Sequence, residues 1–245
     1  MIDSYLVLGA SSGVGKELFL KLLSEGKNVV GVSRSIEQTL NDIPSKYSES
    51  SLLINYEFKE LDDSVKFLSN LSKAHGAFRG IFISVGVESI KTSKLLSEKD
   101  LNIVFLPPLI ATLSVIKNSF KDKFLSKESS VVVMSSVSAV KSTPGLLLYG
   151  SSRAAIESVV KTASLELATK SKNINCIRAG AFKSEMHERV TSSFSSEQLK
   201  DYESDFPLGF GEVKDLLGII DLLMDYKRSR WISGTAINVD GGYLS

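Results

Sequence analysis

Residues 9–19 read GASSGVGKELF, and this stretch decides how the rest of the chain is interpreted. It follows a short apolar run, YLVLG at 5–9, and leads into an amphipathic segment. Glycines at a strand-to-helix turn let backbone N–H groups approach a phosphate at the positive end of the helix. The spacing G-x-x-x-G-x-G differs from the G-x-G-x-x-G dinucleotide fingerprint. Taken alone, the stretch is therefore also compatible with a tight turn that binds nothing.

Further short apolar runs follow the first one along the whole chain. They are β-branched and apolar at consecutive positions rather than at alternate ones, which is typical of strands covered on both faces of a parallel sheet. The runs lie at 28–33, 51–56, 80–86, 130–136, 173–180 and 235–241, and the candidate helices between them lie at 14–25, 62–74, 109–119, 150–170 and 212–226. This alternation predicts one doubly wound α/β domain over residues 1–245. A position after the first strand of such a sheet favours the phosphate-binding interpretation of the glycine turn.

Three segments are predicted to lie outside the regular elements. The polar residues 35–50 and 120–130 are expected to form loops. Residues 183–211 have weak periodicity and contain Gly209 and Gly211, which favours a flap.

The overall composition excludes several classes of protein. The chain has 245 residues and a net charge of +1, so it offers no electrostatic case for binding nucleic acid or an anionic membrane. Its single cysteine, Cys176, excludes an internal disulfide and is expected in the core. The N-terminal residues do not resemble a signal peptide, and no apolar stretch approaches the roughly 18 residues of a membrane span. We expect a cytoplasmic protein, and the sequence predicts no metal site.

The end of the second predicted strand bears on the choice of dinucleotide. An NAD-binding fold usually offers an acid there to the adenosine ribose, whereas an arginine can hold a 2′-phosphate. The segment reads VGVSRS at 30–35, with Ser33 and Arg34 and no acid. Because a guanidinium pairs well with phosphate, NADP(H) is favoured and NAD(H) is the less favoured alternative.

Together these motifs resemble those of the short-chain dehydrogenase/reductase family, and within it the β-ketoacyl-carrier-protein-reductase-like group. The resemblance rests on GASSGVG at 9–15, VVVMSSVSA at 131–139 leading to Tyr149, NCIRAG at 175–180 and the terminal INVDGGYLS. It implies a Rossmann-type domain with a seven-stranded parallel sheet, a nicotinamide cofactor and hydride exchange between a carbonyl and an alcohol. The cofactor contacts that it implies come from Gly9, Ser11, Ser12, Gly13, Val14, Gly15, Ser33, Arg34, Gly86, Tyr149, Arg153, Gly180, Phe182 and Ser184.

The resemblance also selects candidate catalytic residues. The family's serine lies thirteen residues before its tyrosine, which selects Ser136 and Tyr149, with Ser135 left as an alternative. A serine can donate a hydrogen bond to the substrate oxygen, and a tyrosine can supply the proton in reduction or accept it in oxidation.

Several positions depart from the family pattern. Asn-Asn-Ala-Gly becomes ISVG at 83–86, the catalytic asparagine aligns with Phe105, and the catalytic lysine is Arg153. The family's lysine hydrogen-bonds the nicotinamide ribose, favours the ionised tyrosine and passes protons toward water, with a water held by the asparagine. Tyr149 and Arg153 are four residues apart and so share a helix face. An arginine can take the first two roles but not the third, because it effectively never releases its proton.

Two interpretations therefore stay open. In the first, the chain is an oxidoreductase with an atypical Ser136–Tyr149–Arg153 site acting on a small carbonyl or alcohol. In the second, it is a catalytically impaired dinucleotide-binding relative that serves as a sensor, subunit or scaffold. The retained serine and tyrosine favour the first interpretation, and the joint loss of asparagine and lysine favours the second. The resemblance further implies a homotetramer or homodimer, paired through the helices at 109–119 and 150–170.

Overall fold

The computed structural model describes residues 4–36, 41–44, 47, 49–192 and 194–245. Its centre is a parallel sheet of seven strands in the order β3-β2-β1-β4-β5-β6-β9. These strands are β1 (Ser4–Leu8), β2 (Asn28–Ser33), β3 (Ser51–Asn55), β4 (Phe78–Ile83), β5 (Leu125–Ser136), β6 (Lys172–Ala179) and β9 (Ala236–Val239). Each coincides with a predicted apolar run, so the predicted α/β class and seven-stranded parallel sheet are confirmed.

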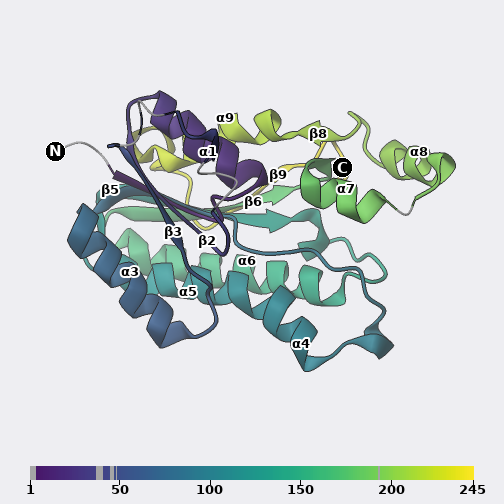
Figure 1. The fold of residues 1–245 in the computed structure, drawn as a ribbon, viewed down its shortest axis with the longest axis horizontal. Coiled ribbons are helices and arrows are strands. Elements are labelled where there is room, and N and C mark those ends of the chain that lie inside the picture. The colour runs from purple at the N-terminus through teal and green to yellow at the C-terminus, as the bar shows by residue number, and fades with distance from the viewer. Residues whose placement is uncertain (1–3, 37–40, 45–46, 48, 193) are drawn as a thin grey trace.

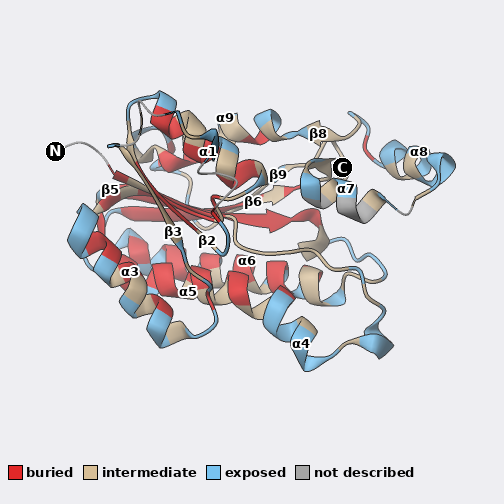
Figure 2. Cartoon of the chain, in the orientation of Figure 1, coloured by how far each residue is buried: buried red, intermediate tan, exposed pale blue. Residues whose placement is uncertain are grey.

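Helices cover both faces of the sheet (Figure 1). On one face lie α1 (Gly13–Ser24), α9 (Val213–Met224) and the short α10 (Tyr226–Ser229), and on the other lie α3 (Leu61–His75), α5 (Leu106–Ser119) and α6 (Leu147–Ala168). Figure 2 shows the sheet and the inner helix faces buried, with the outer helix faces exposed. Consecutive apolar residues form these strands because both of their faces are buried, one against each helical layer.

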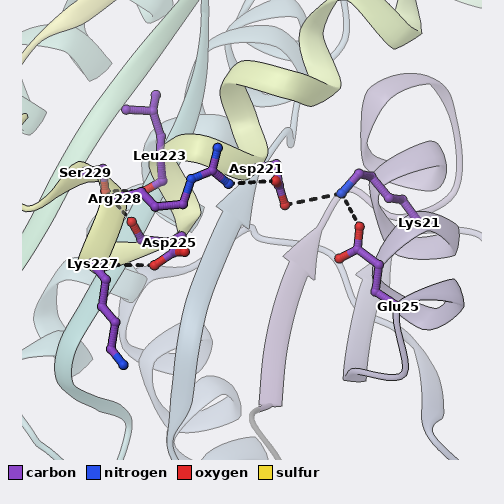
Figure 3. Close-up of polar contacts among 8 residues, drawn as sticks. All are labelled: Lys21, Glu25, Asp221, Leu223, Asp225, Lys227, Arg228 and Ser229. Atoms are coloured by element: carbon purple, nitrogen blue, oxygen red, sulfur yellow. Dashed lines mark hydrogen bonds and ion pairs between the residues drawn. The ribbon is translucent and has the colours of Figure 1, made fainter.

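Ion pairs join the helices on the first face at their solvent side. Lys21 of α1 lies between Glu25 and Asp221, and it contacts Asp221 of α9 at 3.2 Å (Figure 3). Arg228 of α10 reaches the other oxygen of Asp221, also at 3.2 Å. Because these groups are partly exposed, each ion pair contributes only about 0–1 kcal/mol to the free energy of unfolding. The pairs therefore orient the helices more than they stabilise the fold.

The loop prediction for residues 120–130 was wrong in its second half. β5 begins at Leu125, five residues before the apolar run, and Phe78 N donates to Phe124 O at 2.8 Å beside it. The polar residues Ser129 and Ser130 are fully buried there. Pairing with β4 and β6 specifies the strand at these positions, which local composition cannot reveal.

The helix before β5 is longer than predicted. Helical backbone starts with α4 (Glu98–Asp100), passes through a π-helical turn at Leu101–Phe105 and continues as α5. Pro107 and Pro108 lie directly after the π turn. A proline has no N–H to donate to the carbonyl four residues earlier, and its ring clashes with that carbonyl. The wider π-helical turn before Pro107 and Pro108 leaves room for the two rings.

This stretch, Glu98–Ser119, is also long and apolar enough by length and composition to cross a membrane, with a mean hydropathy of 1.4 over its most apolar window. No stretch of this kind was predicted from the sequence. Its α5 part packs between α3 and α6 and against the sheet, with Ala111 and Val115 fully buried. Burial in the core accounts for the apolar character of that part, whereas Leu101 and Ile103 before it are exposed.

The predicted flap consists of two helices held at both ends by a small sheet. β7 (Phe182–Lys183) pairs in parallel with β8 (Gly211–Glu212). Between them lie α7 (Glu185–Thr191) and α8 (Ser196–Ser204), which stand beyond the carboxyl ends of the strands in Figure 1. The sequence did not indicate this second sheet, because strands of two residues carry no periodicity.

Candidate active site

A pocket of about 550 Å³ lies at the carboxyl ends of the parallel strands. Its wall is formed by the residues that follow β1, β2, β3, β4, β5 and β6 and by the flap. Doubly wound folds bind their ligands at this edge of the sheet. The pocket extends from the glycine turn at one end to the flap at the other, so it joins the predicted phosphate-binding turn to the predicted catalytic residues.

The glycine turn has a shape that only glycine permits. Gly9 has φ +92°, and a Cβ there would lie 2.7 Å from Ser84 Oγ. Gly13 has φ +51°, and a Cβ on it would meet no atom within 4 Å, so this residue borders open space. A Cβ on Gly15 would overlap the carbonyl oxygen of Gly9. Gly15 is the one predicted cofactor residue that does not line the pocket, because it lets α1 pack closely on the turn instead.

The first turn of α1 opens toward the pocket. Its N-cap, Ser12, has an extended backbone and its side chain makes no capping hydrogen bond. Ser12, Gly13 and Val14 all line the pocket. Helix N-terminal N–H groups without an internal partner suit an anionic phosphate. The turn therefore fits the diphosphate of a dinucleotide.

The end of β2 forms the neighbouring wall. Ser11 and Ser33 are joined through their hydroxyl oxygens at 2.6 Å, and both line the pocket. Arg34 follows with an exposed side chain that forms no ion pair with any residue described by the structure. Tyr56 and Phe58, which follow β3, complete this wall and were not identified from the sequence. Aromatic side chains that line the same end of the pocket as a guanidinium suit an adenosine that carries a phosphate.

The two candidate serines differ in their partners. Ser135 donates its hydroxyl to the buried carboxylate of Glu157 at 2.6 Å, and Arg178 pairs with the same carboxylate at 2.6 Å. Ser136 instead caps the turn after β5, accepting from the backbone N–H of Ser138 at 3.2 Å. The geometry therefore favours Ser136 as the serine available to a ligand, because the Ser135 hydroxyl is committed to Glu157.

Arg153 is almost fully buried, at 5% exposure, yet it borders the pocket. Its Nη1 donates to Met134 O at 3.2 Å and to Val85 O at 3.5 Å, which ties α6 to the ends of β4 and β5. Its Cζ lies 4.8 Å from the centroid of the Tyr149 ring, a cation–π distance. The Nε atom is buried without a hydrogen-bond partner among the residues that the structure describes. Arg153 is thus held in place by main-chain carbonyls and packs against the Tyr149 ring.

Gly86 leaves the space that the guanidinium fills. It has φ +146°, and a Cβ on it would overlap Arg153 Nη2 and lie 3.2 Å from Cζ. A side chain at position 86 would therefore displace the guanidinium from this place.

No asparagine replaces the one that the family places on the helix before β5. Phe105 ends the π turn and does not line the pocket, whereas Ile103 and Pro107 from the same helix do. Asn102 is exposed and likewise stays outside the pocket lining.

The substrate end of the pocket is aromatic. Phe182 and Ser184, predicted to contact the nicotinamide, line the pocket here, and Ser184 caps α7 by accepting from His187 N at 3.2 Å. Gly180 also lines it, and a Cβ there would lie 2.7 Å from Asp240 Cα. Further lining residues come from distant parts of the chain and were not predicted from the sequence, namely Glu88, Ile90, Thr143, Tyr202, Asp205, Phe206 and Tyr243.

Ring contacts connect the flap to the C-terminal segment. Phe206 stacks on Tyr243 at 4.4 Å between centroids, and Lys141 Nζ lies 3.6 Å from the centroid of the Tyr243 ring. Burial, with help from the nearby Glu88 carboxylate, raises the pKa of Tyr202 to about 12. Burial also lowers the pKa of His187 below its ordinary value. Near neutral pH these two residues therefore present an un-ionised phenol and a neutral imidazole.

Known proteins resemble this chain over nearly all of its length. The profile of a family described as enoyl-(acyl carrier protein) reductase matches residues 9–244. The 3-oxoacyl-(acyl-carrier-protein) reductase FabG of Staphylococcus aureus is 24% identical over 247 residues, which cover 99% of this chain and 98% of that protein. Elsinochrome reductase 1 of Elsinoe fawcettii is 22% identical over 249 residues, covering 96% and 92%.

Solved structures share the fold. A 4-hydroxyisoleucine dehydrogenase complexed with NADH superposes with a TM-score of 0.87 at 19% identity, covering 98% of each chain. ElxO with NADP bound superposes with a TM-score of 0.85 at 23% identity, covering 100% of this chain and 99% of that one.

Proposed function

Because the chain belongs to the short-chain dehydrogenase/reductase family, we propose that it is an NADP(H)-dependent oxidoreductase that exchanges a hydride with a small carbonyl or alcohol. The observation that carries this proposal is that one pocket joins the glycine turn at α1 to Ser136 and Tyr149. A protein that only bound the dinucleotide would need the glycine turn, but it would not need Ser136 and Tyr149 at the opposite end of the pocket.

The nucleotide end of the pocket supports the choice of cofactor. The open first turn of α1 would hold the diphosphate, and Arg34 would pair with a 2′-phosphate. The remaining contacts are proposed to come from Gly86, Arg153, Gly180, Phe182 and Ser184 near the nicotinamide. When bound, the cofactor supplies or accepts the hydride.

The chain's own residues carry the proton chemistry. Ser136 would donate a hydrogen bond to the substrate oxygen and so stabilise the charge that develops on it. Tyr149 would give its phenolic proton to that oxygen in reduction and take it back in oxidation. Arg153, buried and held 4.8 Å from the centroid of the Tyr149 ring, would fix the orientation of that ring toward the substrate.

The substrate is expected to be apolar or aromatic around its reacting carbon. Leu146, Phe206 and Tyr243 line this part of the pocket, and Ile90 and Ile103 border it. A mostly apolar wall with a few polar groups orients a ligand without demanding a charge on it.

A specific observation favours the second interpretation, a catalytically impaired relative. The Nη1 atom of Arg153 is committed to main-chain carbonyls, so the side chain supports the site but cannot exchange its proton. A protein kept for cofactor binding alone would bind NADPH and show no substrate-dependent oxidation of it.

We also propose a cytoplasmic homo-oligomer. Leu165 on the outer face of α6 is 77% exposed and Trp231, in the loop after α10, is 90% exposed. That loop lies against α6, since a Cβ on Gly234 would touch Ser164. An apolar surface on α6 supports pairing of two copies through this helix.

The test is oxidation of NADPH in the presence of a panel of ketones and aldehydes, compared between the wild type and Tyr149→Phe. We expect substrate-dependent turnover only in the wild type, with NADPH affinity by calorimetry within a few fold in both. Equal background oxidation by the two proteins across the panel would reject the oxidoreductase and favour the binding protein.

A further inference from the structure

Glu88 is a carboxyl group of the candidate active site that the family pattern does not supply. It lies two residues after Gly86, in the segment that follows β4, and it is half-buried in the pocket wall. The Gly86 backbone lies directly against the Arg153 guanidinium, and the Cζ atom of that guanidinium lies 4.8 Å from the centroid of the Tyr149 ring. Glu88 is therefore carried by the same short segment that contacts the arginine behind Tyr149.

The groups that face Glu88 come from several elements. Arg153 of α6 and Tyr202 of α8 interact with Glu88 through charge, and the Glu88 charge opposes the ionisation of Tyr202. Tyr149 of α6 lines the same pocket as Glu88. The remaining titratable groups of this end of the pocket are Glu185, His187, Asp205 and Tyr243. Burial raises the pKa of Glu88, and the Arg153 charge opposes this only in part.

The other carboxyl groups of the pocket differ from Glu88 in their surroundings. Glu57 belongs to the nucleotide end and pairs with Lys59 at 2.7 Å. Glu185 and Asp205 have exposed side chains. Among the pocket residues that the structure describes, Glu88 combines partial burial with an upward pKa shift.

The proposed reaction requires such a group. Each reduction removes one proton from Tyr149, which must be replaced before the next turnover. Arg153 cannot supply it, and neither Phe105 nor its neighbours offer the amide that the family uses to hold a relaying water.

On the basis of the proposed function, we infer that Glu88 returns the proton to Tyr149 and so replaces the missing lysine and asparagine. In reduction, the hydride carries two electrons to the carbonyl carbon, the carbonyl π pair moves to oxygen, and that oxygen takes the Tyr149 proton. The Glu88 carboxylic acid then protonates the phenolate across the water of the pocket and becomes a carboxylate. It regains a proton from solvent, so one hydride and one solvent proton enter the product.

The first test uses the unliganded protein and needs no turnover. Infrared spectra are recorded against pH for the wild type, Glu88→Gln and the control Glu166→Gln, which changes an exposed residue of α6 outside the pocket. We expect a carboxylic acid band that persists above the ordinary range of glutamic acid, is absent in Glu88→Gln and is unchanged in Glu166→Gln. Arg153→Ala should extend the band to higher pH, because removal of the cation raises the pKa of Glu88. A band indifferent to Glu88→Gln would overturn the inference.

The second test measures turnover with the carbonyl that the wild type reduces. Glu88→Gln should lower kcat at least about tenfold, the lower end for loss of a general acid, and leave the NADPH dissociation constant within about twofold. Added small carboxylic acids should restore part of the rate, which no purely structural role would permit. In an Arg153→Lys background the loss should shrink, because lysine can titrate.

The failures of the two proposals are distinguishable. If the wild type is active and Glu88→Gln matches Glu166→Gln in kcat and in pH profile, only the role of Glu88 is overturned. If the wild type binds NADPH and reduces no carbonyl, the proposed function fails, and the inference fails with it.

Discussion

Replacement of Gly86 by alanine should show how tightly Arg153 is built into the site. The new methyl group would overlap Nη2 and approach Cζ to 3.2 Å, at a backbone φ of +146° that L-residues rarely adopt. A strained backbone position costs about 1–3 kcal/mol. Overpacking against a buried group adds about 1–3 kcal/mol. We therefore expect the free energy of unfolding to fall by roughly 2–6 kcal/mol in Gly86→Ala.

A matched control separates the two contributions. Gly26 has φ +74°, and a Cβ there would meet no atom within 4 Å, so Gly26→Ala carries the backbone cost alone. Urea unfolding should show Gly86→Ala losing about 1–3 kcal/mol more than Gly26→Ala. The difference should shrink when Arg153→Lys is added, because the ammonium lacks the Nη2 branch. Equal losses in the two alanine variants would refute the placement of the guanidinium against Gly86.

Three further predictions concern the serines, the nucleotide end and assembly. Ser136→Ala should lower turnover, measured by steady-state kinetics. Ser135→Ala should mainly lower the midpoint of thermal unfolding, since the Ser135 hydroxyl is bound to a buried carboxylate. The opposite result would assign the catalytic role to Ser135. Arg34→Ala should reduce the preference for NADPH over NADH by about 1–3 kcal/mol in calorimetry, the scale of a hydrogen bond to a charged group, and equal affinities in the wild type would exclude the NADP assignment. Light scattering at micromolar concentration should give a dimer or tetramer that Leu165→Asp weakens, and a monomeric wild type would contradict the oligomer.

The fold was predictable because its strands are buried on both faces. Runs such as VVVMSS remain apolar over consecutive residues, and such a pattern depends little on context. The start of β5 was not predictable, because Ser129 and Ser130 are polar and look like loop residues in the sequence. They are buried in the structure because β5 pairs with β4 and β6 on its two sides. The π turn was not predicted either, although Pro107 and Pro108, the residues that it accommodates, are visible in the sequence.

The candidate site divides in the same way. Gly9, Gly13 and Tyr149 belong to local motifs with fixed spacing, and the pocket brings them together. Glu88 and Tyr202 reach the pocket from segments without a recognisable pattern. Their signal is three-dimensional, because only the folded chain shows which polar groups converge on one cavity.

Transfer of deuterium tests the central claim, that the chain is an oxidoreductase using Tyr149. NADPH labelled at the hydride-donating carbon of nicotinamide is incubated with a reducible carbonyl, and the alcohol is analysed by mass spectrometry. We expect one deuterium in the alcohol formed by the wild type and none from Tyr149→Phe over the same time at equal cofactor occupancy. An unlabelled product from every carbonyl, with NADPH demonstrably bound, would contradict the account.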